Sequence, residues 1–276
     1  MHTTLIRPAD LSPHLADPRW VVVDCRFDLA NPAWGEEQYV AGHIPGARYA
    51  HLDRDLSGTK TGTNGRHPLP TVEQMAATFG ALGIAPDTQV VAYDADSGMY
   101  AARLWWMLRF VGHDAVAVLD GGFARWVAEG GAVQPGRVTA TPTVFSPRPR
   151  VEWSLTVDEV ATGVNGVLVD ARAPERFRGM NETLDPVAGH IPGARNYFFQ
   201  QNLAEDKTFK PAAELRAQWD AVLQGEDPSA VVMYCGSGVT ACHNLLAMEV
   251  AGLPGSRIFP GSWSEWCADP TRPVET

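Results

Sequence analysis

The sequence predicts an α/β protein of two tandem domains, each an open, mainly parallel sheet with helices on both faces. Two observations predict this fold. The octapeptide AGHIPGAR occurs twice, at Ala41–Arg48 and at Ala188–Arg195. Within each copy, short runs of β-branched residues alternate with helical stretches. Such alternation is typical of βαβ units, in which helices cover both faces of a parallel sheet.

The internal repeat extends well beyond the octapeptide. The stretches WVVVDCR, VVAYD and DGGFARW recur in the same order as GVLVDAR, VVMYC and PGSWSEW, about 140 residues later. A period of this length is that of a whole domain and not of a solenoid unit. We therefore expect a first domain over residues 1–134 and a second over 152–276, joined by a proline-rich extended linker over 135–151.

The composition argues against several classes of partner. The formal net charge is −10 and no long basic stretch occurs, which makes nucleic acid and anionic membranes poor partners. The longest apolar runs, such as Leu104–Leu108, are far too short to span a bilayer, and the N-terminus lacks the apolar core of a signal peptide. Four scattered cysteines without a CxxC pair predict neither a disulfide framework nor a metal site. We expect a cytoplasmic protein.

The strongest candidate for chemistry is Cys235, at the end of the apolar strand run Val231–Tyr234. It heads the loop CGSGVT, and a helix-like stretch begins directly after that loop. Ligands of open α/β sheets bind beyond the carboxyl ends of the strands. The glycines let backbone N–H groups curl around the sulfur, and the helix N-terminus adds partial positive charge. Both effects favour the reactive thiolate and would hold a persulfide formed on it.

The other cysteines fit a structural interpretation, because free cysteine usually packs as a small buried hydrophobe. We apply it to Cys25, Cys242 and Cys267. The first copy carries Asp94 at the position that corresponds to Cys235. Without a thiol this copy cannot perform the same chemistry. We therefore expect one catalytic and one supporting domain, with Asp94 in a structural or electrostatic role.

At these residues the chain resembles the tandem-domain rhodanese family of thiosulfate and 3-mercaptopyruvate sulfurtransferases. The resemblance covers nearly the whole chain and rests on the paired GHIPGA motifs, Asp94, CGSGVT and the segment Gly261–Trp266. It implies two rhodanese-like domains. Nothing in the sequence points to a metal or an organic cofactor. The resemblance also implies that Cys235 takes a sulfur atom from a small donor and passes it to an acceptor. That acceptor would be cyanide or a thiol, such as thioredoxin or a small thiol.

The loop composition bears on the choice of donor. Thiosulfate-preferring relatives carry a loop resembling CRKGVT, whose two cations match a small dianion, whereas Gly236 and Ser237 are neutral. This difference favours 3-mercaptopyruvate, with thiosulfate as the alternative donor. By resemblance, Ser237 would polarise or deprotonate the thiol of the donor. We expect the rest of the loop to bind the donor: Gly236, Gly238, Val239 and Thr240.

A donor with a carboxylate calls for an arginine, whose fork grips a carboxylate bidentately. By resemblance this residue is Arg176, with Arg178 as its substitute. Arg172 is expected instead in a structural role, either in a salt bridge with Asp170 or at a helix end. Mercaptopyruvate-type relatives often carry a second arginine shortly before the second GHIPGA motif, but residues 184–186 of this chain include none.

The resemblance further implies a Ser–His–Asp relay, with His43 of the first GHIPGA motif reaching Ser237. However, His190 holds the same place in the second motif, where no chemistry is expected. A hydrogen bond that fixes the turn is therefore an equal alternative for His43. Three upstream residues are candidates for the acid of the relay: Asp28, Glu36 and Glu37. The pair Arg66-His67 lies in a glycine-rich stretch, which we expect to be an interdomain loop lining the site.

Two other functions are alternatives to sulfur transfer. Cysteine-dependent phosphatases share this architecture but carry a Cys-x5-Arg loop, whose arginine clamps phosphate. Here the position of that arginine is Ala241. A non-catalytic rhodanese-type binding module usually lacks the active cysteine, as the first copy does, whereas Cys235 is retained. Both observations favour a sulfurtransferase.

Overall fold

The computed structural model describes residues 1–276, and the chain divides into two compact units. The first comprises Met1–Gly58, Pro70–Arg150 and Glu205–Thr208, and the second comprises Thr59–Leu69, Val151–Ala204 and Phe209–Thr276. The proline-rich segment expected as a linker therefore belongs to the first unit through residue 150. Residues 59–69 belong to the second unit, although the chain enters them from the first. None of the helices combines the length and the apolar composition that a membrane span requires.

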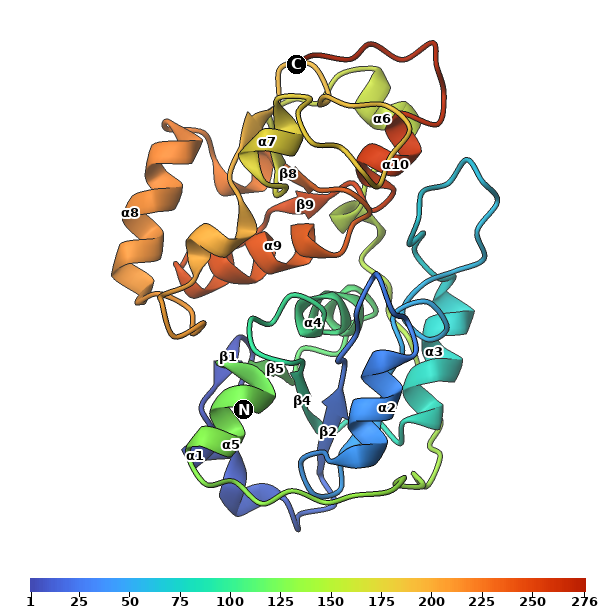
Figure 1. Cartoon of the computed structure of the whole chain (residues 1–276), viewed down its shortest axis with the longest axis vertical. Helices are drawn as coiled ribbons and strands as arrows, with labels where there is room; N and C mark the ends of the chain where they lie inside the picture. Colours follow the sequence, from blue (N-terminus) through green and yellow to red (C-terminus); the bar gives the residue numbers. More distant parts are fainter. The chain divides into compact units, whose positions relative to one another are not determined.

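The first unit is built on a five-stranded parallel sheet in the order β1-β5-β4-β2-β3. Its strands are β1 (Leu5–Ile6), β2 (Trp20–Asp24), β3 (Arg48–Tyr49), β4 (Gln89–Tyr93) and β5 (Val116–Leu119). Its helices are α1 (Pro8–Leu11), α2 (Trp34–Ala41), α3 (Val72–Ala81), α4 (Ala101–Phe110) and α5 (Gly122–Ala128), with a 3₁₀ turn at Ser12–His14 (Figure 1). The central strands are continuous apolar runs, as expected for strands that helices cover on both faces.

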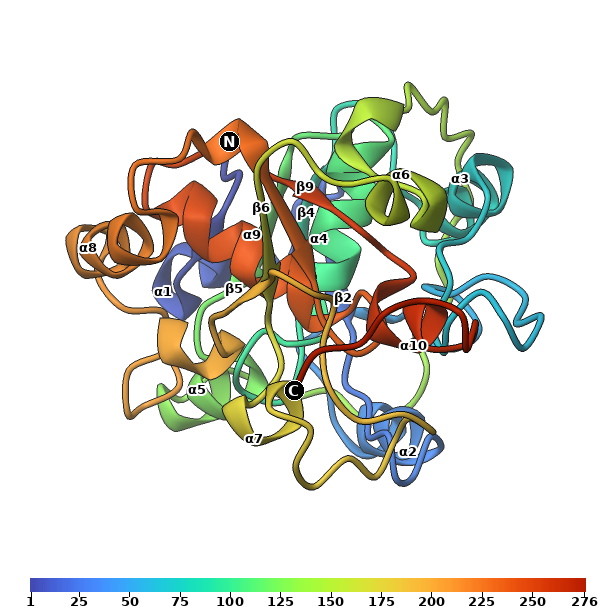
Figure 2. The same ribbon diagram turned by 90° about the horizontal axis from the view of Figure 1, so that it is seen from above.

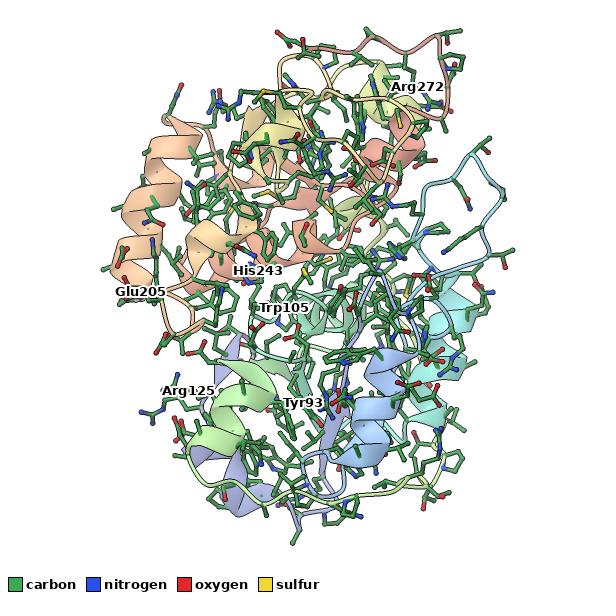
Figure 3. All side chains as sticks on the ribbon, in the orientation of Figure 1. Tyr93, Trp105, Arg125, Glu205, His243 and Arg272 are labelled. Carbon is green, nitrogen blue, oxygen red and sulfur yellow. The ribbon has the colours of Figure 1, made fainter.

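Side-chain alternation along the strands builds the core of this unit, because successive residues of a strand point to opposite faces. Val22, Val91 and Tyr93 share one hydrophobic cluster with Leu11 of α1 and Trp126 of α5. Figure 3 labels Tyr93 in this interior. Helix α4 contacts β4 and β5. Helices α1, α4 and α5 thus cover the sheet and bury its apolar side chains.

The second unit repeats the plan with a four-stranded parallel sheet in the order β7-β6-β8-β9, which matches β3-β2-β4-β5 of the first unit. Its strands are β6 (Val167–Asp170), β7 (Arg195–Asn196), β8 (Val231–Tyr234) and β9 (Arg257–Ile258). Its helices are α6 (Val157–Ala161), α7 (Pro174–Phe177), α8 (Ala212–Leu223), α9 (Thr240–Val250) and α10 (Ser262–Trp266), with 3₁₀ turns at Val151–Trp153, Phe199–Asn202 and Pro228–Ala230.

Helices cover both faces of the second sheet. Val232 and Tyr234 pack against Trp263 and Trp266 of α10, whereas α9 contacts β8 and α8. Figure 2 shows α8 and α9 to one side of the strands and α6 and α10 to the other. The predicted fold class, two α/β domains with parallel sheets, is confirmed.

The two repeats also share their internal ion pairs. Arg172 pairs with Asp170 at 2.7 Å, with both side chains buried, and donates to the carbonyl oxygen of Gly189 at 2.7 Å. In the first unit, Arg26 makes the same contacts with Asp24 and with a motif glycine, at 2.6 and 2.7 Å. The structural interpretation of Arg172 is thus confirmed. In each unit, the arginine thus connects the end of β2 or β6 with the AGHIPGAR motif of the same unit.

Candidate functional site

Cys235 lies directly after β8, at the carboxyl edge of the second sheet. Its sulfur accepts a hydrogen bond from the backbone N–H of Gly238 at 3.1 Å, and α9 begins at Thr240. Gly238 has φ +75°, in the left-handed region that glycine enters without steric cost. This conformation turns its amide back towards the sulfur. The loop therefore holds a buried cysteine sulfur against a backbone donor and beside a helix N-terminus.

The start of α10 holds the loop in place. The hydroxyl of Ser262 accepts a hydrogen bond from the N–H of Cys235 at 3.1 Å. The N–H groups of Trp263 and Ser264 donate to the carbonyl oxygens of Cys235 and Gly236, both at 3.0 Å. The segment PGSWSEW, which the repeat singled out, thus supports the loop through three backbone contacts.

Ser237 has an imidazole partner within the second unit. Its hydroxyl oxygen lies 2.7 Å from Nδ1 of His67, and both side chains are buried. A hydroxyl that is hydrogen-bonded to an imidazole can pass a proton in either direction. Sequence reasoning treated His67 as a pocket-lining residue only. The available signal was its place beside Arg66, after a glycine-rich stretch.

His43 lies in the first unit and makes structural contacts there. Its Nδ1 is 2.8 Å from the carbonyl oxygen of Tyr39, and its ring stacks on the Tyr39 ring. His190 repeats this arrangement with Phe177, at 2.7 Å and again stacked. The identical pattern in both copies supports the interpretation in which the motif histidine fixes the turn. The imidazole that contacts the Ser237 hydroxyl is that of His67, and the relay role of His43 stays a prediction.

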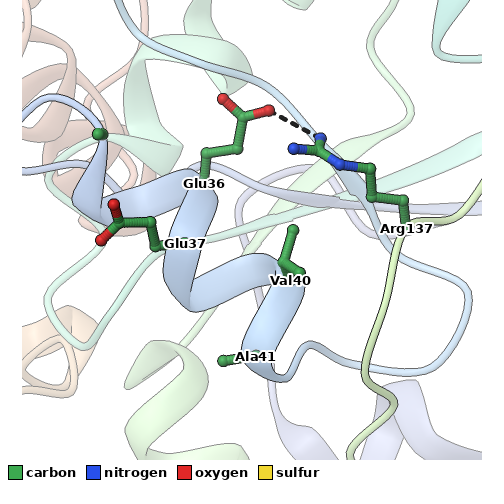
Figure 4. Close-up of a pocket in the computed structure, with 6 residues that line it drawn as sticks. Glu36, Glu37, Val40, Ala41 and Arg137 are labelled. Atoms are coloured by element: carbon green, nitrogen blue, oxygen red, sulfur yellow. Dashed lines mark hydrogen bonds and ion pairs between the residues drawn. The ribbon is translucent and has the colours of Figure 1, made fainter.

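The carboxylates considered as the acid of the relay also have partners in the first unit. Glu36 forms ion pairs with Arg137 at 2.7 Å and with Arg54 at 2.9 Å, and the Arg137 hydrogen bond lowers the pKa of Glu36 below its usual value (Figure 4). Glu37 follows it on α2 and lines the same surface pocket. Asp28 accepts a hydrogen bond from a backbone N–H two residues on, at 2.8 Å.

Arg176, in α7, is held by two buried carboxylates. Its Nε and Nη2 donate to Glu182, both at 2.9 Å, and its Nη2 lies 3.3 Å from Oδ2 of Asp185. Arg66 pairs with the other oxygen of Asp185. Burial raises the pKa of Asp185 in spite of both arginines. Burial alone would raise the pKa of Glu182 as well, but the N–H of Leu184 and the Arg176 guanidinium outweigh it and lower that pKa.

Both guanidinium groups converge on Gly236, the residue after Cys235. A Cβ at this position would lie 2.8 Å from Nη2 of Arg66 and 3.6 Å from Nη1 and Nη2 of Arg176. Arg178, in contrast, is exposed and lies 3.8 Å from Glu175. Of the two arginines predicted to bind the donor, the structure brings Arg176 to the loop.

The acidic residues that hold the arginines were missed by sequence reasoning. Glu182 and Asp185 lie between Arg176 and the second AGHIPGAR motif, on a segment without helix or strand. The only signal was their charge in a stretch flanked by arginines. Val239 and Thr240, predicted to bind the donor, form the N-cap and the first residue of α9.

The first unit shows what the same strand end does without a thiol. The Asp94 carboxylate accepts hydrogen bonds from the N–H groups of Gly98, Tyr100 and Ala101, at 2.9, 2.7 and 3.2 Å. The Asp94 carboxylate thus accepts the backbone N–H hydrogen bonds that this loop can offer. This arrangement is the structural role expected for Asp94.

The remaining cysteines are buried and have structural surroundings. Burial raises the pKa of the Cys25 thiol well above its usual value, and burial likewise raises the pKa of Cys267 to about 11. The Cys242 thiol donates to the carbonyl oxygen of Gly238 at 3.4 Å. Cys25 and Cys267 are therefore poor nucleophiles, because the thiolate is the reactive form.

Comparisons with known proteins agree with this geometry. Residues 7–129 and 156–269 each match the family described as Rhodanese-like domain. A probable 3-mercaptopyruvate sulfurtransferase from Pseudomonas aeruginosa is 46% identical over 279 residues, which cover 99% of this chain and 98% of that protein. A putative thiosulfate sulfurtransferase from Mycobacterium tuberculosis is 42% identical over 258 residues, which cover 92% of this chain and 89% of that protein.

Solved structures show the same similarity. The 3-mercaptopyruvate sulfurtransferase from Leishmania major superposes with a TM-score of 0.86 at 33% identity, over 96% of this chain and 74% of that one. A 3-mercaptopyruvate sulfurtransferase from Escherichia coli superposes with a TM-score of 0.81 at 29% identity, over 96% of this chain and 100% of that one.

Proposed function

Because this chain belongs to the rhodanese family of sulfurtransferases, we propose that it moves a sulfur atom from 3-mercaptopyruvate, through a persulfide on Cys235, to a thiol or cyanide acceptor. One observation carries the proposal: the Cys235 sulfur accepts the Gly238 N–H, and the imidazole-bound hydroxyl of Ser237 lies in the same loop. A nucleophile, a backbone donor and a proton-transfer pair are thereby contributed by one unit. This combination suits a covalent transfer in two steps.

In the first step, the Cys235 thiolate attacks the sulfur of the donor. An S–S bond forms while the C–S bond of 3-mercaptopyruvate breaks, and the electron pair leaves on carbon as the enolate of pyruvate. That carbon takes a proton to give pyruvate, and the hydrogen of the donor stays on the outer sulfur. In the second step, a thiolate or cyanide attacks the outer sulfur and releases the Cys235 thiolate.

Each neighbouring group has a place in this scheme. The Gly238 N–H would stabilise negative charge on the inner sulfur, when it is a thiolate and again when it leaves the persulfide. The Ser237 hydroxyl, bonded to His67, would contact the donor's thiol and supply the proton that the enolate needs. Arg176 would bind the carboxylate of the donor, since its Nη1 makes no hydrogen bond within the protein.

The acceptor and the compartment belong to the same proposal. A protein thiol such as thioredoxin, a small thiol or cyanide would each accept the outer sulfur by the same attack. All four cysteines are free, and Cys235 must return to the thiol form after every turnover. These requirements suit the reducing conditions of the cytoplasm.

Donor choice gives a direct test. We expect kcat/KM for 3-mercaptopyruvate to exceed that for thiosulfate when both are compared with one acceptor, because Gly236 and Ser237 place no cation within the loop itself. Initial rates over a range of each donor, with cyanide as the common acceptor, measure the two constants. A clear preference for thiosulfate would refute this donor assignment.

Thiosulfate remains the second candidate donor, and a specific observation favours it. Two guanidinium groups lie beside Gly236, so a small dianion would meet cations next to Cys235, although from outside the loop. A binding module without catalysis is tested separately by intact mass after incubation with either donor. One added sulfur on the native chain supports catalysis, and its absence with both donors would favour the binding module.

Replacement of Arg176 by alanine tests the carboxylate anchor. We expect KM for 3-mercaptopyruvate to rise about 10- to 100-fold, with kcat changed by less than about threefold. The reason is that a hydrogen bond to the carboxylate is equally strong in the ground state and the transition state, so its loss weakens binding without slowing the chemical step. Steady-state kinetics at saturating acceptor measure both constants. Arg216→Ala, which removes an exposed arginine of α8, is the matched control. An unchanged KM would remove Arg176 from this role.

A further inference from the structure

The cation that the active loop lacks is supplied by a different part of the chain. We propose that Arg66 is a second donor-binding residue, which contacts the anionic group of the donor together with Arg176 and is positioned for this by Asp185. The proposal rests on the function proposed above and adds a residue to its site. It concerns small donors that carry an anionic group, such as a 2-oxo carboxylate.

The geometry at Gly236 places Arg66 at the site. Nη2 of Arg66 lies 2.8 Å from the point where a Cβ of residue 236 would be, nearer than either terminal nitrogen of Arg176 at 3.6 Å. A side chain at position 236 would therefore require this guanidinium to shift from its place. The glycine leaves room next to Cys235 for a cation that arrives from the segment 59–69.

The backbone of that segment is anchored to the loop. The N–H of Arg66 donates to the hydroxyl of Ser264 at 3.0 Å, and the N–H of Ser264 donates to the carbonyl oxygen of Gly236 at 3.0 Å. The next residue, His67, bonds to Ser237. Arg66 is thus held from both sides by contacts to the residues that surround Cys235.

The hydrogen bonds of the two arginines leave donors available. Arg66 bonds to Asp185 through Nη1, and Arg176 uses Nε and Nη2 for Glu182 and Asp185. Nη2 of Arg66 and Nη1 of Arg176 have no protein acceptor, and both atoms belong to groups that face Gly236. A guanidinium has donors to spare for a second carboxylate after it has bound the first.

The two arginines and the two carboxylates that they contact form one cluster, and its members differ in exposure. The side chains of Arg66 and Arg176 are 27% and 21% exposed, whereas those of Asp185 and Glu182 are each 2% exposed. The carboxylates lie behind the arginines and orient them, and the cationic ends are the parts open to solvent. An incoming anion therefore meets positive charge first, although the cluster as a whole is close to neutral.

Kinetics on three variants test the role of Arg66. For Arg66→Ala we expect KM for 3-mercaptopyruvate and the inhibition constant of pyruvate to rise together about 10- to 100-fold, with kcat changed much less. Arg66→Lys should recover part of the loss, since it keeps the charge without the fork. Lys60→Ala removes an exposed cation of the same segment and should behave as wild type. An unchanged KM in Arg66→Ala would overturn the proposal.

A double variant separates binding from mere neutralisation of Asp185. If Arg66 served only to balance that buried carboxylate, then Arg66→Ala combined with Asp185→Asn would regain the wild-type KM. We expect the double variant to stay impaired and to fold, as judged by its urea unfolding midpoint. Recovery of KM in the double variant would overturn the proposal.

The donor function itself is checked independently of Arg66. Intact mass of the wild-type chain after exposure to 3-mercaptopyruvate reports whether a persulfide forms on Cys235. If the wild-type chain forms a persulfide but the kinetics of Arg66→Ala are unchanged, only the proposed role of Arg66 is refuted. If the wild-type chain gains no sulfur, the proposed transfer of sulfur from 3-mercaptopyruvate is refuted.

Discussion

Replacing Cys235 with serine should lower turnover at least about 1000-fold with either donor, because removal of a covalent nucleophile leaves only the residual catalysis of the surrounding site. A serine hydroxyl is far less nucleophilic than a thiolate and cannot form a persulfide. The substitution is nearly isosteric, so the Gly238 amide and the Ser237–His67 pair keep their places. The loss would therefore report on chemistry and not on folding.

Two measurements check this expectation. Steady-state rates give the loss of turnover, and intact mass after exposure to the donor shows whether sulfur is retained. Cys267→Ala is the control, because that thiol is buried and its pKa is raised to about 11. It should keep near wild-type activity and still gain one sulfur. Turnover of the Cys235→Ser variant within a few-fold of wild type would contradict the covalent scheme.

Replacing Gly238 with alanine should lower kcat almost as much as replacing Cys235 with serine. The new Cβ would clash with the carbonyl group of Pro260, and φ +75° is unfavourable for any residue with a side chain. The loop must then shift, and the Gly238 N–H moves away from the sulfur that it contacts at 3.1 Å. Loss of one such preorganised donor costs about 100- to 1000-fold in kcat, and we expect a decrease of that size.

Gly252→Ala is the matched control for this substitution. Gly252 also has positive φ, at +71°, but a Cβ there meets no atom within 4 Å. Backbone strain should cost each variant about 1 kcal/mol of stability in urea unfolding, and the clash with Pro260 should add to the loss in Gly238→Ala alone. Only Gly238→Ala should lose activity. Equal activity in the two variants would show that the amide contact at the sulfur does not matter for turnover.

The position of Cys235 at a strand end, before a glycine-rich turn, could be predicted because its signals are local. A buried strand, a cysteine at the strand's end and a glycine-rich turn before a helix are contiguous in the sequence, and they remain contiguous in the structure. The buried pair of Asp170 and Arg172 is two residues apart and was predicted for the same reason. Contacts of this kind follow from strand geometry alone.

The imidazole partner of Ser237 could not be predicted in this way. His67 and Ser237 are 170 positions apart, and Arg66 and Asp185 are 119 apart. Nothing in the repeat indicates these pairs, since the segment 59–69 lies within the first copy in sequence but belongs to the second unit. The motif histidine His43 was the more visible candidate, and its contacts prove to be those of its structural twin His190.

Sequence pattern alone predicted the duplicated α/β plan, the place of Cys235 at the head of a glycine-rich loop, and the absence of a thiol at the corresponding position of the first copy. Each depends on periodicity or on neighbouring residues, which a linear pattern records directly. The histidine that contacts Ser237 and the cations that flank Gly236 became visible only in the folded chain. Those contacts arise when a loop from one half of the chain packs on a strand end of the other, and pairing over such separations leaves no trace in local pattern.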